Sequence, residues 1–121
     1  QVLTRSDCGT TVLFLIDIHH PRSDDQVFDD AAIRDVAVVL RQCTRKGDVV
    51  ARLVGNEFAV LAAGLQPSSV GRFVRRFRTE TSGKLSRRVD VGHVTASSGM
   101  TLGTLLRLAD GRMYADGMRQ T

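Results

Sequence analysis

Aromatic residues are scarce in this chain, which has no Trp, one Tyr and five Phe among its 121 residues. Proteins that bind single-stranded nucleic acid combine a basic groove with aromatic side chains on which the bases stack. The basic residues of this chain are not interleaved with aromatic ones. We therefore expect no nucleic-acid partner.

Long apolar runs and metal-type cysteine spacing are also absent. No run approaches the roughly 20 residues of a membrane span, and the N-terminus lacks the basic-then-apolar pattern of a signal peptide. In such a chain Cys8 and Cys43 are interpreted as reduced thiols. We expect a cytoplasmic location without membrane insertion, either alone or as the cytoplasmic part of a larger protein.

The length and charge describe an ordinary globular domain. We expect one domain over residues 1–121 with a single core. Gln1 begins in mid-pattern without a methionine, which suggests a domain excised from a multidomain protein. The net charge of +4 could suit nucleic acid, anionic lipid or a nucleotide. A solvated basic face is the simpler interpretation, and we prefer it.

The apolar pattern predicts strands and helices in alternation. Residues 12–16 form a continuous apolar run, typical of a central strand buried on both faces, and Asp17 stands at its end. An acidic cluster at residues 24–30 precedes a helical apolar series that reaches Cys43. Helix capping explains this cluster better than metal binding does.

The second half of the chain predicts two more helices and a strand. Pro67 opens a helix whose basic face we expect to be solvated, and residues 89–96 alternate as a strand. Thr101 is placed to cap the last helix. The basic face holds Arg72, Arg75, Arg76 and Arg78, and the apolar face of the last helix holds Leu102, Leu105, Leu106, Ala109 and Met113.

A hairpin lies at the centre of this pattern. Two apolar segments, residues 49–53 and 58–62, flank the turn Val54-Gly55-Asn56-Glu57, and a Gly-Asn pair between such segments indicates a β-hairpin. The whole order is strand, helix, strand, strand, helix, strand, helix. It predicts an α/β protein of the ferredoxin-like type, an α+β sandwich with a central, mostly antiparallel sheet flanked by helices.

The hairpin sequence Ala51-Arg52-Leu53-Val54-Gly55-Asn56-Glu57-Phe58 resembles the signature of GGDEF domains, the diguanylate cyclases that join two GTP into cyclic di-GMP. The resemblance extends from about Val12 to Tyr114 and implies the palm-type core of that family. The helix that normally begins these domains has no matching motif here, so we expect it to be truncated or absent.

The resemblance implies a catalytic site that survives only in part. The metal ligands of the family fall on Asp17, the carbonyl of Ile18, and Asn56, which replaces a carboxylate. A neutral amide is a poorer Mg²⁺ ligand than a carboxylate. His19 replaces the second Asp of the strand-end motif, and Glu57 is retained.

The substrate-binding positions implied by the family are altered as well. They fall on Arg22, Asp25 and Arg34, and the phosphate-binding lysine falls on Gly117. The first glycine of the signature is Val54, whose side chain intrudes where a phosphate must approach the backbone. We expect catalysis to be lost and no cofactor to be required, with Mg²⁺ involved only if GTP binding remains.

A second family motif is intact. Arg45-Lys46-Gly47-Asp48 resembles the Arg-x-x-Asp site at which many GGDEF enzymes bind cyclic di-GMP, and it precedes the signature by the usual five residues. A guanidinium can bind a phosphate or the acceptor edge of guanine, and a carboxylate can accept from guanine N–H groups. The alternative is that Arg45 and Lys46 are basic helix-end residues and Asp48 a turn residue.

Three hypotheses follow for the function. The chain is an inactive regulatory domain that binds cyclic di-GMP at Arg45 and Asp48, or a nucleotide-independent scaffold for dimerisation or protein interaction, or a weak diguanylate cyclase acting through Asp17, Asn56 and Glu57. The candidate partners are cyclic di-GMP, neighbouring signalling domains, a separate protein and a second copy of the chain.

Overall fold

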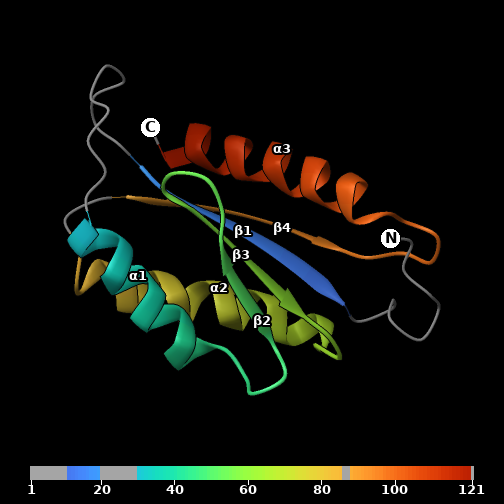
Figure 1. The fold of residues 1–121 in the computed structure, drawn as a ribbon, viewed down its shortest axis with the longest axis horizontal. Helices are drawn as coiled ribbons and strands as arrows, with labels where there is room; N and C mark the ends of the chain where they lie inside the picture. Colours follow the sequence, from blue (N-terminus) through green and yellow to red (C-terminus); the bar gives the residue numbers. More distant parts are fainter. Residues whose placement is uncertain (1–10, 20–29, 86–87, 121) are drawn as a thin grey trace.

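The computed structural model describes residues 11–19, 30–85 and 88–120, which form one sheet with helices on both faces (Figure 1). The predicted order of elements is confirmed. The elements are β1 (Val12–Ile18), α1 (Asp30–Cys43), β2 (Val49–Arg52), β3 (Glu57–Ala62), α2 (Pro67–Ser82), β4 (Val89–Thr95) and α3 (Leu102–Gln120). No helix within these described ranges is long and apolar enough to cross a membrane.

The sheet has the order β2-β3-β1-β4, and each neighbouring pair is antiparallel. Helices α1 and α2 cover one face and α3 covers the other, as Figure 1 shows. This is the α+β sandwich that the sequence predicted. The arrangement places β1 at the centre, with β2 and β4 at the two edges.

Strand β1 is buried on both faces, as its continuous apolar run predicted. Its even-numbered residues, Phe14, Ile16 and Ile18, belong to the larger core cluster with α1 and α2, while Leu13 and Leu15 pack with α3. Side chains alternate between the faces of a strand. Asp17 is therefore directed to the α3 face.

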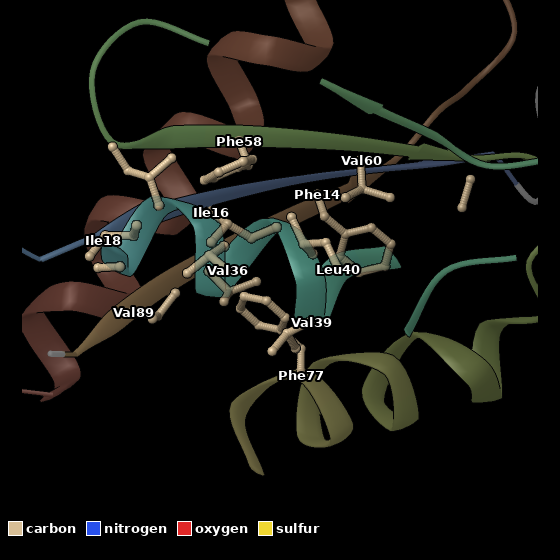
Figure 2. Packing of buried hydrophobic residues seen from close by; sticks show 14 of the residues in the cluster. Phe14, Ile16, Ile18, Val36, Val39, Leu40, Phe58, Val60, Phe77 and Val89 are labelled. Carbon is tan, nitrogen blue, oxygen red and sulfur yellow. The ribbon is translucent and has the colours of Figure 1, made fainter. Parts of the chain in front are cut away.

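The larger core cluster lies between the sheet and the two helices α1 and α2. Figure 2 shows Phe14 of β1 close to Leu40 of α1, with Phe77 of α2 below Val39. Phe14, Phe77 and Leu40 have no exposed surface. Burial of large apolar side chains is the main source of stability for a domain of this size.

Helix α3 packs closely on β4 because Gly92 has no side chain. A Cβ at Gly92 would overlap backbone atoms of Ala109 and Met113. The helix begins as predicted, since the Thr101 hydroxyl accepts a hydrogen bond from the Thr104 N–H at 3.1 Å.

Two predictions for the helices are wrong. Leu102 is not a core residue, because it lies in the first turn of α3 and is 43% exposed. Arg78 does not belong to the solvated face of α2, because it is half-buried and bonded to Asp116 of α3. Residues 1–10 and the acidic residues before Asp30 lie outside the described residues.

Candidate functional site

Three carboxylates stand side by side at one end of the sheet. Asp17 of β1 is the register partner of Glu57 on β3 and of Asp90 on β4. The hairpin turn lies beside them, because the Ile18 N–H donates a hydrogen bond of 3.1 Å to the Asn56 carbonyl. The structure thus brings together Asp17, Ile18, Asn56 and Glu57, which were predicted from distant parts of the sequence.

Two carboxyl groups of this row, Asp17 and Glu57, have raised pKa values. Burial raises the pKa of Asp17 to about 6, and the negative charges of Glu57, Asp90 and Asp110 add to the rise. Burial also raises the pKa of Glu57, with a further contribution from Asp110. Both causes disfavour the ionised form of these two groups.

A cavity of about 250 Å³ opens over this row beneath α3. We call it the carboxylate pocket; it is lined by Asp17, Arg88, Asp90, Asp110, Met113, Tyr114, Gly117 and Met118. Arg88 is the basic residue of its lining, and Arg88 Nε donates to Asp90 Oδ1 at 3.1 Å. Arg88 Nη2 also lies 2.8 Å from Nδ1 of His19. Its guanidinium is therefore engaged by other side chains.

Gly117 borders the Asp90 carboxylate in this pocket. A Cβ at position 117 would lie 2.9 Å from Asp90 Oδ2, which is closer than real Cβ contacts come. The resemblance places a phosphate-binding lysine at this position. In this chain the negatively charged side chain of Asp90 occupies the space beside position 117.

The pocket residues do not fit a complete Mg²⁺ site. The described part of the chain contains no group of three or more His, Cys, Asp or Glu side chains that could hold a metal ion. One unusual donor is present, because Oδ1 of Asn56 is buried and has no hydrogen-bond partner among the described residues. This oxygen belongs to a neutral amide, which is a poorer Mg²⁺ ligand than a carboxylate at the same place.

Of the three predicted substrate-binding residues, the structure describes Arg34 alone. Arg34 is exposed on α1 and is not among the residues that line the carboxylate pocket. Arg22 and Asp25 lie outside the described residues.

A second cavity lies at the C-terminal end of α1. Arg45 and Asp48 form an ion pair there, with Arg45 Nη2 at 3.0 Å from Asp48 Oδ1. The Asp48 carboxylate also accepts from the Arg45 N–H at 2.8 Å, and Arg45 Nη2 donates to the Ala63 carbonyl at 2.7 Å. The Asp48 side chain is 6% exposed and that of Arg45 is 50% exposed. The guanidinium is therefore the accessible member of the pair.

This second cavity has a volume of about 260 Å³. We call it the arginine pocket, and it is bordered by Arg45, Asp48, Arg72 and Arg76. Its apolar lining includes Phe14 and Phe73, whose ring centroids are 4.5 Å apart. Such a pocket combines guanidinium groups with an aromatic surface, which suits a ligand with both anionic and planar parts.

The sequence had not indicated several of these pocket residues. Arg72 and Arg76 were assigned to a solvated face, and they border the arginine pocket because α2 passes beside the end of α1. Asp90 carried a weak signal, since it occupies a polar position in an alternating strand. Arg88 carried none, because its neighbours in the pocket come from other elements.

Comparison with known proteins identifies the class. The chain matches the family model "Diguanylate cyclase, GGDEF domain" over residues 26–119. It belongs to this family, whose members act in cyclic di-GMP signalling. No curated protein matches the sequence.

Solved GGDEF structures share the fold of this chain. An EAL/GGDEF domain protein from M. capsulatus is 26% identical with a TM-score of 0.77, and the match covers 96% of this chain and 83% of that one. The GGDEF domain of DgcB from Caulobacter crescentus, solved with c-di-GMP, is 25% identical with a TM-score of 0.77, over 89% of this chain and 72% of that one.

A more distant likeness involves a larger protein. The diguanylate cyclase SiaD from Pseudomonas aeruginosa, solved with its activator SiaC, is 18% identical with a TM-score of 0.73. The match covers 91% of this chain, which spans 47% of the length of SiaD. This likeness shows the fold alone.

Proposed function

We propose that this chain is a catalytically inactive GGDEF regulatory domain that binds cyclic di-GMP in the arginine pocket. The observation that carries the proposal is the placement of Arg72 and Arg76 beside the Arg45–Asp48 pair. Two residues of a short motif thereby become part of a cavity with three guanidinium groups and one carboxylate.

The chemistry of the pocket matches the parts of cyclic di-GMP. Guanidinium groups bind phosphate oxygens in paired hydrogen bonds, and the Asp48 carboxylate can accept from the N–H groups of a guanine. The half-buried ring of Phe73, which lies against Phe14, offers an apolar surface for a purine. DgcB, a relative with the same fold, has been solved in complex with c-di-GMP, which supports this ligand.

The carboxylate pocket supports the absence of catalysis. Joining two GTP needs the charge of the triphosphates to be neutralised, whereas this pocket gathers Asp17, Asp90 and Asp110 and offers Arg88 as its cation. The Asn56 amide and the glycine at position 117 remove two further charges that the family uses. The proposed function therefore requires no cofactor and no Mg²⁺.

Calorimetric titration with cyclic di-GMP tests the proposal. The parent chain should show saturable binding, and Arg45→Ala should lower the affinity at least about tenfold, the loss of one hydrogen-bonded charge. Arg75→Ala is the matched control, because Arg75 is an exposed residue of α2 outside the pocket lining. Equal affinities for the parent and Arg45→Ala would rule out this site.

A scaffold that binds no nucleotide is the second candidate. It is favoured by the contacts of Arg45. This side chain bonds to Asp48, which precedes β2, and to the carbonyl of Ala63, which follows β3. These contacts give the motif a structural role without any ligand. Absence of heat with cyclic di-GMP, together with lower stability of Arg45→Ala, would select this candidate, with a protein or a second copy of the chain as partner.

Weak cyclase activity is the third candidate and rests on the neighbouring carboxylates Asp17 and Glu57. It predicts slow formation of cyclic di-GMP from GTP with Mg²⁺ or Mn²⁺, lost in Asp17→Ala. Absence of product at high enzyme concentration would exclude it. Together with the regulatory function we propose a cytoplasmic location and neighbouring signalling domains, because GGDEF domains act in signalling within larger proteins.

A further inference from the structure

The arginines that border the arginine pocket differ in the partners that hold them. Arg45 is bound by the Asp48 carboxylate and by the Ala63 carbonyl. No hydrogen bond or ion pair joins Arg72 or Arg76 to another residue in the part of the chain that the structure describes. Both of these side chains are exposed and line the pocket. Their guanidinium groups are therefore available to a ligand.

The two available arginines lie on one face of α2. Ser69, Arg72 and Arg76 follow one another at spacings of three and four residues, and residues so spaced are neighbours on a helix surface. Arg76 lies near the end of α1, because its charge opposes the rise that burial causes in the pKa of Cys43. Arg72 lies one turn closer to the start of α2. The arginines thus form a row along the pocket, with Arg76 between Arg72 and the end of α1.

The arginine pocket is small for a dinucleotide. Its volume of about 260 Å³ lies just below the roughly 300–1,000 Å³ of pockets that enclose a drug-sized ligand. It offers the half-buried ring of Phe73 and the carboxylate of Asp48 to a base. Cyclic di-GMP contains two guanine nucleotides. The pocket therefore suits one of them and leaves the other at the surface.

The row of arginines favours one kind of phosphate over another. A guanidinium group binds two oxygens through parallel hydrogen bonds. A phosphodiester, as in cyclic di-GMP, has two free oxygens and a single negative charge, which one guanidinium satisfies. A terminal phosphate has three free oxygens and a charge of about −1.5 to −2 at pH 7. It can therefore bind Arg76 and Arg72 together, which a phosphodiester cannot do to the same extent.

We propose that the arginine pocket prefers a guanine nucleotide with a terminal phosphate, and that Arg72 determines this preference. It rests on the proposed function, because both place the ligand in the same pocket. The favoured ligand is the linear guanine dinucleotide with a 5′-phosphate. Hydrolysis of one phosphodiester bond of cyclic di-GMP supplies it, since water adds to the phosphorus and the 3′ oxygen leaves as a hydroxyl. The domain then responds to the breakdown of cyclic di-GMP as well as to its presence.

Calorimetric titration with three nucleotides tests this preference. The probes are cyclic di-GMP, the linear dinucleotide with its 5′-phosphate, and the linear dinucleotide without it. The phosphorylated linear form should bind about tenfold more tightly than the unphosphorylated one, the gain expected from an additional charged hydrogen bond. It should also bind at least about threefold more tightly than cyclic di-GMP. Equal affinities for the two linear forms, or tighter binding of the cyclic form, would overturn the proposal.

Arg72→Ala tests the role of this residue in specificity. The variant should lose about tenfold in affinity for the phosphorylated linear form and only about two- to threefold for cyclic di-GMP. Arg75→Ala is the matched control, since Arg75 lies on the same helix outside the pocket lining, with Nη1 3.2 Å from the place of a Cβ at Gly71. A merely structural role of Arg72 would weaken both ligands equally, and that result would overturn the proposal.

The same titrations distinguish failure of this preference from failure of the proposed function. Binding of cyclic di-GMP that is weakened in Arg45→Ala, with equal affinities for the two linear forms, would overturn the preference and leave the proposed function intact. Binding of the phosphorylated linear form alone would support the preference and exclude cyclic di-GMP as the ligand. Binding of none of the three would overturn both. Displacement of the phosphorylated form by an equal concentration of inorganic phosphate would show a general anion site and overturn the preference.

Discussion

Asp17 lies between the carboxylates of two neighbouring strands, and its protonation is therefore linked to folding. Its pKa rises from an ordinary value of 3.8 to about 6 in the folded chain, through burial and the nearby charges. A carboxyl group whose pKa is raised by folding stabilises the folded state at low pH. This contribution is lost as the pH rises through about 4 to 6.

Asp17→Asn tests this linkage, because the amide remains neutral at every pH. The variant should be more stable than the parent at pH 8, by roughly 1 kcal/mol after discounting for the half-exposed position, and equally stable below about pH 4. Urea unfolding at both pH values measures the difference, with Asp35→Asn on α1 as the control. A difference between Asp17→Asn and the parent that is the same at both pH values would contradict the assigned pKa.

Gly111 and Gly117 form a matched pair within α3. Nothing lies within 4 Å of a Cβ at Gly111, while a Cβ at Gly117 would lie 2.9 Å from the Asp90 carboxylate. Gly111→Ala should stabilise the chain by about 0.5–1 kcal/mol through helix propensity. Gly117→Ala should lack this gain or destabilise the chain. Urea unfolding measures both variants.

The expected difference in stability between Gly111→Ala and Gly117→Ala comes from the Asp90 carboxylate, and a double variant tests this cause. In an Asp90→Ala background the contact is removed, so Gly117→Ala should recover the gain seen for Gly111→Ala. If Gly117→Ala is as stabilising as Gly111→Ala in the parent, Asp90 does not occupy the space that we assign to it.

At the scale of elements, the contact between α3 and β4 depends on Gly92. A Cβ there would overlap the backbone of α3, which is not able to adjust as a flexible side chain would. Gly92→Ala should destabilise the chain by about 2–3 kcal/mol, measured by urea unfolding. Stability within 0.5 kcal/mol of the parent, the usual range for surface changes, would show that α3 packs less closely.

The elements were predicted well where the signal is local. The apolar run of β1, the turn at Gly55, which has a φ of 69°, and the Thr101 cap all depend on residues adjacent in sequence. Arg78 was wrongly assigned because its partner Asp116 is 38 residues away on another helix. Leu102 fitted the helical spacing, but it lies in the first turn, beyond the part of α3 that the sheet covers.

The residues of the candidate sites also separate into those with a local sequence signal and those without one. Asp17, Asn56, Arg45 and Asp48 could be named as candidates, because the family signature fixes their spacing. Arg72, Arg76 and Arg88 could not, because each becomes part of a pocket only when separate elements pack together. A periodic arginine on a helix looks solvated in sequence whether or not a cavity lies beside it.

At the scale of the whole molecule, the proposed function rests on the contrast between two pockets. The arginine pocket has cations beside an apolar lining, while the carboxylate pocket has Asp90 beside Gly117. We propose on this ground that the chain binds a product-like nucleotide and does not make it. This view of the chain as a receptor is the central claim.

Calorimetric titration of Arg76→Ala with cyclic di-GMP, beside the parent and Arg45→Ala, tests this claim most directly. Arg76 lies outside the Arg-x-x-Asp motif and enters the account through the pocket alone. We predict saturable binding to the parent and a loss of at least about tenfold in both variants. Binding unaffected by either variant, or no binding to the parent, would contradict the account.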